Sequence, residues 1–215
     1  MKITPLSLIA AALSTLMGCN MVDMSTRPTT LVQPTPVYAG LGKPWPLYDE
    51  SLTTGGGLDF FSGGTFTGLP VIDLANKSNP YSGTNCWKFS VPAQTGGWFC
   101  GVQLLQGQNY ADSAAKPATD LSAPGFTQCV FYARTGAGTT QVKFEAFSDG
   151  VVFGGGANPN NLTVNITPSW QKYTIPLVNG AHMHDLKHYF TIIFANSAPT
   201  TATPIDLFID ALRYE

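Results

Sequence analysis

Three histidines near residue 185 are the first candidates for chemistry, because closely spaced imidazoles can hold a transition metal. Residues 181–188 read AHMHDLKH. In an extended chain His182 and His184 share a face, whereas in a helix His184 and His188 do, and Asp185 offers a third ligand. The segment falls between two predicted strands, where loops collect polar residues without a chemical role. We therefore predict a loop here rather than a metal site.

Other kinds of catalytic site find little support in the residues. The sequence has no Gly-x-Ser-x-Gly motif of the kind that carries a nucleophilic serine. Glycoside hydrolysis needs two carboxylates, and Glu145 has no obvious acidic partner. The strand patterns of sandwich-fold polysaccharide lyases are not recognisable either. The residues therefore predict a binding protein rather than an enzyme.

Five side chains are candidates for binding a sugar. Alternation along the predicted strands places Gln103, Tyr132 and Arg134 opposite the core-facing residues. An aromatic ring stacks on the apolar face of a pyranose, while amide and guanidinium groups bind its hydroxyls. Trp98 and Phe99 are adjacent, so one of them points away from the core. We predict that these five bind carbohydrate, and that the first three converge if their strands are neighbours; an ordinary polar sheet face is the alternative.

Composition predicts the elements that must position these residues. The chain of 215 residues has 11 Lys and Arg against 13 Asp and Glu, a net charge of −2, and no cluster of basic residues suited to a nucleic-acid backbone. It also has 22 Gly, 16 Pro and 12% aromatic residues, which is typical of short strands joined by tight turns. We therefore predict an all-β domain that does not bind nucleic acid.

Apolar runs between turn clusters predict nine strands, a number that favours a sandwich or a barrel. Alternation within them assigns eight residues to the core, namely Val102, Leu104, Cys129, Phe131, Ala133, Val142, Phe144 and Ala146. The predicted strands are 47–52, 83–91, 98–105, 126–134, 141–148, 162–166, 171–177, 189–195 and 206–214.

The first 44 residues have the composition of a leader followed by a tether. Residues 1–18 carry one Lys and an apolar run that is too short to span a membrane, which is typical of a signal peptide. The letters LMGC ending at Cys19 resemble the bacterial lipoprotein box, which implies cleavage before Cys19 and its lipidation. Asn20 then implies the outer membrane, on either its surface or its periplasmic face. Residues 19–44 predict a Pro/Thr-rich tether, ahead of one domain at 45–215.

Short motifs from residue 47 onward follow one another in a characteristic order. They are YDESL at 48–52, FSGG at 61–64, YSG at 81–83, GWFCGVQL at 97–104, DLS at 120–122, FYAR at 131–134, WQKYTIPL at 170–177 and FIDAL at 208–212. This order resembles the jelly-roll carbohydrate-binding modules, which have a galactose-binding-like sandwich. The resemblance implies an antiparallel two-sheet β-sandwich of jelly-roll type and, more weakly, a glycan ligand.

The same resemblance implies a structural calcium ion. In that family, acidic residues of the first strand and an Asp of the last strand hold the ion, and Asp49 or Glu50 and Asp210 match those places. Ala211 stands where the family usually has a second Asp. Solvated strand-end carboxylates are the alternative.

Three cysteines remain once Cys19 is lipidated, so one disulfide can form. Cys86 and Cys100 flank a hairpin-like turn, which favours their pairing. Strand parity opposes it, because Cys86 lies opposite the core-facing residues of its strand and Cys100 lies with them. Cys129 fits an inert core thiol.

These observations predict a non-catalytic lipoprotein that binds a polysaccharide or oligosaccharide and touches the membrane only through its lipid. A structural or protein-binding lipoprotein with the same fold is the first alternative. A polysaccharide-degrading enzyme is the second.

Overall fold

The computed structural model describes residues 44–52, 57–63, 68, 70–93, 99–106, 125–148, 158–178, 188–195 and 204–215. The chain divides into two units, Met1–Gln33 and Pro34–Glu215, and every described residue belongs to the second. The predicted signal peptide, Cys19, most of the tether, Trp98, His182 and His184 lie outside the described residues. Within those ranges, no helix is long and apolar enough to cross a membrane.

The first of two sheets has seven strands and contains both the first and the last strand of the domain. β12 is its centre: it pairs with β7 on one side, and with β5 and β1 on the other. β10 then pairs with β7, β4 with β5 and β2 with β1, all antiparallel. The bounds are β1 Trp45–Asp49, β2 Ser51–Leu52, β4 Val71–Asn76, β5 Cys86–Val91, β7 Gln128–Thr135, β10 Gln171–Pro176 and β12 Ile205–Tyr214.

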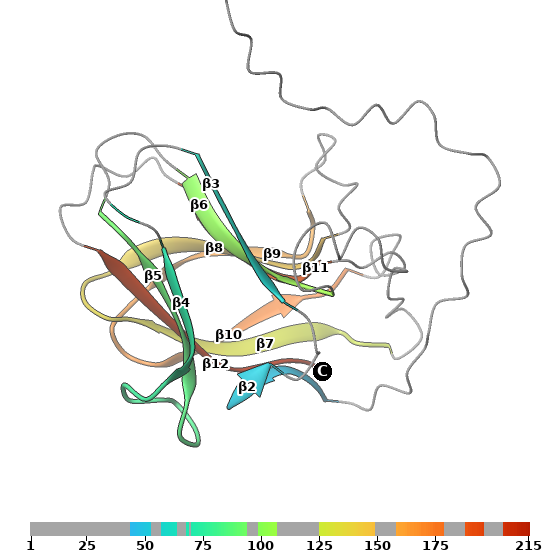
Figure 1. The fold of residues 1–215 in the computed structure, drawn as a ribbon. Helices are drawn as coiled ribbons and strands as arrows, with labels where there is room; N and C mark the ends of the chain where they lie inside the picture. The colour runs from blue at the N-terminus through green and yellow to red at the C-terminus, as the bar shows by residue number, and fades with distance from the viewer. Residues whose placement is uncertain are drawn as a thin grey trace, which may run out of the picture. The chain divides into compact units, whose positions relative to one another are not determined.

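The second sheet has five strands in the order β3-β6-β11-β8-β9, and every pairing in it is also antiparallel. Figure 1 shows the two sheets as separate layers facing each other. The bounds are β3 Leu58–Gly63, β6 Phe99–Leu105, β8 Thr140–Ser148, β9 Asn161–Ile166 and β11 His188–Ala195. The predicted antiparallel two-sheet sandwich of jelly-roll type is confirmed.

The core lies between the two sheets and is built by strand alternation. All eight residues that alternation assigns to the core are fully buried. Aromatic rings join the layers: Phe131 of β7 lies 4.6 Å from Phe144 of β8, and Phe89 of β5 lies 5.7 Å from Phe194 of β11, measured between ring centroids. Each strand therefore has an inner face in this core and an outer face, and the outer faces of the two sheets lie on opposite sides of the sandwich.

The nine predicted strands are confirmed, with ends shifted by up to three residues. The predicted strand 47–52 is divided into β1 and β2 at Glu50, whose φ is 59°. Strands β3 and β4 are not predicted from the sequence. Both lie at sheet edges and are only partly buried, so their sequences lack the apolar runs that mark the other strands.

All three described cysteines are free thiols and buried. Cys86 lies on the outer side of β5, where its Sγ donates to the Asn76 carbonyl, whereas Cys100 faces the core from β6 in the other sheet. The proximity argument for a Cys86–Cys100 bridge is therefore wrong, and the parity argument is confirmed. Burial raises the pKa of Cys86 to about 11, which leaves an unreactive thiol. Cys129 is a core residue, as predicted.

Candidate functional site

The expected convergence of Gln103, Tyr132 and Arg134 is not found. Gln103 lies on β6 of the five-stranded sheet, and the other two lie on β7 of the seven-stranded sheet. All three are on outer faces, as alternation predicts. Because the strands belong to different sheets, Gln103 is on one side of the sandwich and Tyr132 and Arg134 are on the other.

Two aromatic rings lie across glycines on the outer face of the five-stranded sheet. Phe61 of β3 is opposite Gly101 of β6, and Phe99 of β6 is opposite Gly63 of β3. A Cβ on Gly101 would be 2.3 Å from the Phe61 ring, and a Cβ on Gly63 would be 2.4 Å from the Phe99 ring. The glycines thus leave room for both rings to lie against the sheet. The ring centroids are 6.4 Å apart, and Phe99 is 49% exposed. We call Phe61 and Phe99 the aromatic platform.

A row of polar side chains crosses the same outer face beside the platform. Direct cross-strand pairing joins its five members in order, one from each strand of the sheet: Asp59, Gln103, Thr191, Glu145 and Asn161. Directly paired residues project from the same face, so this polar row runs perpendicular to the strands. It offers the amide and carboxylate groups that bind hydroxyls.

Two members of the polar row hold polar atoms without partners. Glu145 is 3% exposed, and its Oε1 lies 2.5 Å from the Lys143 Nζ. Its Oε2 and the Oγ1 of Thr191 make no hydrogen bond within the described part of the chain. A buried oxygen without a partner costs free energy, so natural sequences keep few of them.

Sequence reasoning finds Phe99 and Gln103 of this face and misses Phe61, Asp59 and Thr191. The FSGG motif at 61–64 is a landmark of the family resemblance, but without β3 as a predicted strand its residues have no assigned face. The pairing of an aromatic with a glycine on the neighbouring strand is a signal that depends on register, which the sequence alone does not supply.

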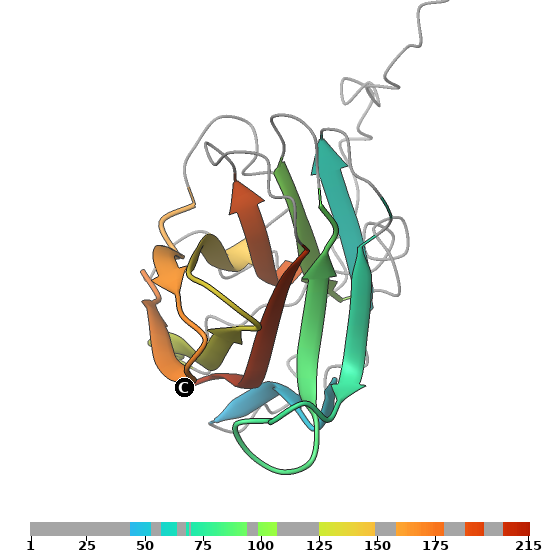
Figure 2. The same cartoon turned by 90° about the vertical axis from the view of Figure 1, so that its left-hand side faces the viewer.

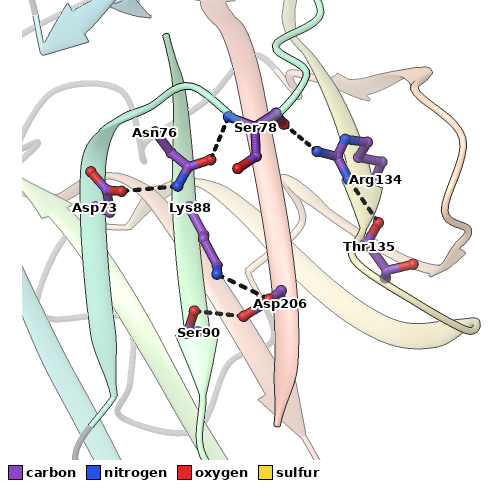
Figure 3. A network of polar contacts seen from close by, with 8 residues as sticks. All are labelled: Asp73, Asn76, Ser78, Lys88, Ser90, Arg134, Thr135 and Asp206. Carbon is purple, nitrogen blue, oxygen red and sulfur yellow. Dashed lines mark hydrogen bonds and ion pairs between the residues drawn. The ribbon is translucent and has the colours of Figure 1, made fainter.

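Arg134 is a structural residue rather than a free sugar-binding group. Only 8% of it is exposed, and its guanidinium donates to the carbonyls of Thr135 and Ser78 (Figure 3). The same group lies 3.8 Å above the Phe208 ring and 5.2 Å from the Trp170 ring. Burial lowers the pKa of Arg134, although it stays charged. The prediction that its donors face a glycan is therefore not supported by the geometry.

A second polar group lies next to this one on the outer side of β5 and β12. Asp206 accepts a hydrogen bond from the Ser90 hydroxyl at 2.6 Å and pairs with the Lys88 ammonium at 3.0 Å (Figure 3). Lys88 is opposite Phe208 in register and lies near its ring. These contacts join side chains of the same sheet. The polar groups on this part of the outer face are therefore already bonded to one another.

Residues 77–85 form the loop between β4 and β5, and Arg134 anchors it through Ser78. Trp170 contributes a second anchor, because its Nε1 donates to the Asn79 carbonyl at 2.9 Å. Figure 2 shows this loop beside β1 and β2, the blue strands. Glu50, between β1 and β2, accepts three hydrogen bonds from this loop. The donors are the Thr84 N–H at 2.8 Å, the Thr84 hydroxyl at 2.7 Å and the Asn85 N–H at 2.9 Å. These bonds lower the pKa of Glu50.

Asp210 holds the middle of the same loop from the last strand. It is fully buried, and its Oδ2 accepts from the N–H groups of Tyr81 at 2.9 Å and Ser82 at 3.1 Å. Its Oδ1 accepts from the N–H of Ala211, which has a φ of 49° at a bulge in β12. Burial is the largest influence on Asp210 and raises its pKa.

The carboxylates predicted to hold calcium are not gathered as a set of three metal-ligating side chains in the described ranges. All four carboxylate oxygens of Glu50 and Asp210 accept hydrogen bonds from N–H or O–H groups, and these bonds hold the β4–β5 loop and the bulge in β12. Asp49 is near enough to raise the pKa of Asp210. In the described ranges no three His, Cys, Asp or Glu side chains gather as metal ligands do.

Tyr132 is covered by Tyr81 of the β4–β5 loop. The two rings are stacked with centroids 3.6 Å apart and planes 14° apart. The Trp170 ring meets Tyr81 edge-on at 6.2 Å. A hydrogen bond between the two tyrosine hydroxyls raises the pKa of Tyr81. Tyr81 itself is 45% exposed, so it is Tyr81 rather than Tyr132 that faces solvent here.

Comparison with known proteins bears on the fold. No protein-family model and no curated protein sequence matches this chain. Among solved structures, a family 30 carbohydrate-binding module has a TM-score of 0.50 at 13% identity, over 79% of this chain and 96% of that chain. A family 11 module from Clostridium thermocellum, in complex with a β-1,3-1,4-mixed-linked tetrasaccharide, has a TM-score of 0.49 at 13% identity, over 79% and 93%. A family 30 module of the cellulosomal cellulase Cel9D-Cel44B of Clostridium thermocellum has 0.49 at 14%, over 79% and 95%.

The sheet order, together with the first of these similarities, defines a fold class. The chain has the jelly-roll β-sandwich fold that carbohydrate-binding modules also have. At 13% identity the likeness extends to the fold alone, so any function has to be argued from the platform and the polar row.

Proposed function

We propose that this domain binds a glycan on the outer face of the five-stranded sheet without cleaving it. The observation that carries the proposal is the aromatic platform, in which Phe61 and Phe99 lie on glycines with Asp59 and Gln103 next to them. A pyranose has an apolar face and a rim of hydroxyls. The platform suits the apolar face, and the polar row suits the rim.

The described part of the surface favours a glycan over a protein partner. In the described ranges only four large apolar residues are well exposed, Val71, Tyr81, Phe99 and Val178. They come from separate elements, and a stable protein interface needs about 800 Å² on each partner. A platform of two rings is closer in size to one or two sugar units.

Affinity electrophoresis of the full chain in gels that contain a soluble β-glucan, xylan, mannan or polygalacturonate tests this proposal. We expect retardation in at least one gel, and about tenfold weaker binding by Phe99→Ala and Phe61→Ala, since loss of one stacked ring is worth roughly 1–2 kcal/mol. Val178→Ala removes an equally exposed apolar side chain elsewhere and should bind normally. Unchanged migration in every gel, or equal binding by Phe99→Ala, would overturn the proposal.

We also propose that the mature protein begins at a lipidated Cys19 and is displayed from the bacterial outer membrane. The LMGC motif and the Pro/Thr-rich residues that follow it support this display. Cys19→Ala should move the protein into soluble fractions or leave its signal uncleaved, and Asn20→Asp should keep the lipid while changing the membrane in which it is found. A Cys19→Ala protein whose signal is still cleaved and which still stays in the membrane fraction would contradict the anchor.

A further inference from the structure

The Tyr81 ring presents an open aromatic face on the side of the sandwich away from the platform. One face of the ring is covered, because Tyr132 is stacked on it at 3.6 Å. The Trp170 ring is 6.2 Å away with its plane tilted by 65°, so it does not stack on the other face. The 45% of Tyr81 that remains exposed therefore belongs to its outward face and its hydroxyl edge.

The backbone that carries Tyr81 is held on both sides. Asp210 accepts the N–H groups of Tyr81 and of Ser82, which fixes the loop directly beneath the ring. Trp170 holds the carbonyl of Asn79, two residues before Tyr81, and Glu50 holds Thr84, three residues after it. A ring fixed in this way loses little freedom when a ligand stacks on it, so its position is preorganised.

Hydrogen-bonding groups surround the stack. The tyrosine hydroxyls lie at its edge, and Lys172 of β10 is directly opposite Tyr132 in register on the same outer face. Lys172 is exposed, and its ammonium forms no ion pair with any residue in the described part of the chain. Arg134, two residues along β7 from Tyr132, is bonded to carbonyls rather than to a carboxylate. The patch therefore offers hydroxyl and ammonium groups around one ring.

The size of the patch identifies its occupant. One ring with a single open face is far smaller than the roughly 800 Å² that a protein partner requires, and no other well-exposed large apolar residue belongs to this loop or to β7 and β10 in the described ranges. It matches the apolar face of one sugar ring, whose hydroxyls would meet the Tyr81 edge and Lys172.

We infer that Tyr81, backed by Tyr132 and flanked by Trp170 and Lys172, is a second glycan-binding surface. It lies on the outer face of the seven-stranded sheet, opposite the platform, so the two surfaces cannot hold adjacent units of one straight chain. One domain with both surfaces bridges two glycan chains, and this bridging depends on the proposed function of the platform.

Mixing the full chain with the soluble polysaccharide that retards it tests this inference. A protein with two surfaces cross-links long chains, so the wild type should produce turbidity at intermediate ratios of protein to polysaccharide. Tyr81→Ala and Phe99→Ala should each abolish the turbidity, and the double variant should also lose retardation in the gels. Lys172→Gln is a second variant that keeps a long polar side chain without the charge, and it should weaken the turbidity. Val178→Ala should behave as the wild type.

The outcomes separate the two proposals. If the wild type binds no polysaccharide in any gel, the proposed function and this inference both fail. If Phe99→Ala alone removes all binding, while Tyr81→Ala and Lys172→Gln cross-link as the wild type does, only the second surface is overturned. Because a melting curve for each variant reports folding, loss of turbidity in a folded Tyr81→Ala protein supports the second surface.

Discussion

The carboxylate of Glu50 lies in the space that a side chain on Gly83 would occupy. A Cβ at Gly83 would be 1.4 Å from Oε1 of Glu50, and the φ of Gly83 is +58°. From this position Glu50 reaches the backbone of Thr84 and Asn85. Gly83 is thus required for two reasons. It adopts a left-handed backbone, and its lack of a side chain leaves room for the Glu50 carboxylate that holds the β4–β5 loop.

Gly83→Ala should therefore destabilise the domain more than a simple change of backbone preference would. Gly138→Ala is the matched control, because Gly138 has a similar φ of +66° and a Cβ added there would meet no atom within 4 Å. The control should lose ~1–2 kcal/mol for the left-handed backbone alone. Urea unfolding should give a larger loss for Gly83→Ala. Equal losses would show that the contact with Glu50 contributes nothing.

The stabilising effect of Glu50 should depend on pH. Its hydrogen bonds hold the folded-state pKa below the ordinary 4.5, so its contribution is complete above pH 4.5 and is lost as the pH falls through the lower folded-state value. Glu50→Gln should therefore melt below the wild type at pH 7, and the two melting temperatures should approach each other as the pH falls below 4.5 and through the lower folded-state pKa. A constant difference across this range would contradict the prediction.

The contribution of Asp210 to stability should change with pH in the opposite direction to that of Glu50. Burial raises its folded-state pKa above 3.8, so its contribution is present at pH values below 3.8 and is lost as the pH rises through the folded-state value. The advantage of the wild type over Asp210→Asn should accordingly be greatest in acid and decrease toward neutral pH. A profile like that of Glu50→Gln would contradict this sign.

Arg134→Lys should reduce stability without changing glycan binding at the aromatic platform, which lies on the other sheet. The lysine keeps the charge but cannot donate to both Ser78 and Thr135 or lie flat on Phe208, so we expect a loss of ~1–3 kcal/mol in urea unfolding. Arg213→Lys is the control, because Arg213 forms a partly exposed ion pair with Glu215 and such pairs contribute little. Weaker glycan binding by a folded Arg134→Lys protein would show that Arg134 belongs to a glycan-binding site.

Local patterns predict the sandwich and its core well, because a strand reveals its inner face by alternation alone. Alternation places Phe131, Phe144 and Val102 in the core and Gln103 and Tyr132 on outer faces. It cannot say that Gln103 and Tyr132 belong to different sheets, since strand order is a property of long-range pairing.

The burial of Arg134 cannot be predicted from the sequence either. It depends on Ser78, which is 56 residues away along the chain. Ser78 lies over β7 because Asp210, Glu50 and Trp170 anchor its loop. The platform depends in the same way on register, because Phe61 and Gly101 are recognisable as a pair only when β3 is aligned with β6.

Calcium should have no effect on stability, contrary to what the family resemblance implies. The oxygens of Glu50 and Asp210 already accept hydrogen bonds from N–H and O–H donors, and in the described ranges no three acidic, His or Cys side chains gather as metal ligands. A ligand that binds only the folded state would raise stability by ~2.7 kcal/mol at a concentration 100-fold above its Kd. We expect identical melting temperatures in excess calcium and in excess chelator, for the wild type and for Asp210→Ala alike. A chelator-induced decrease that Asp210→Ala abolishes would establish the calcium site instead.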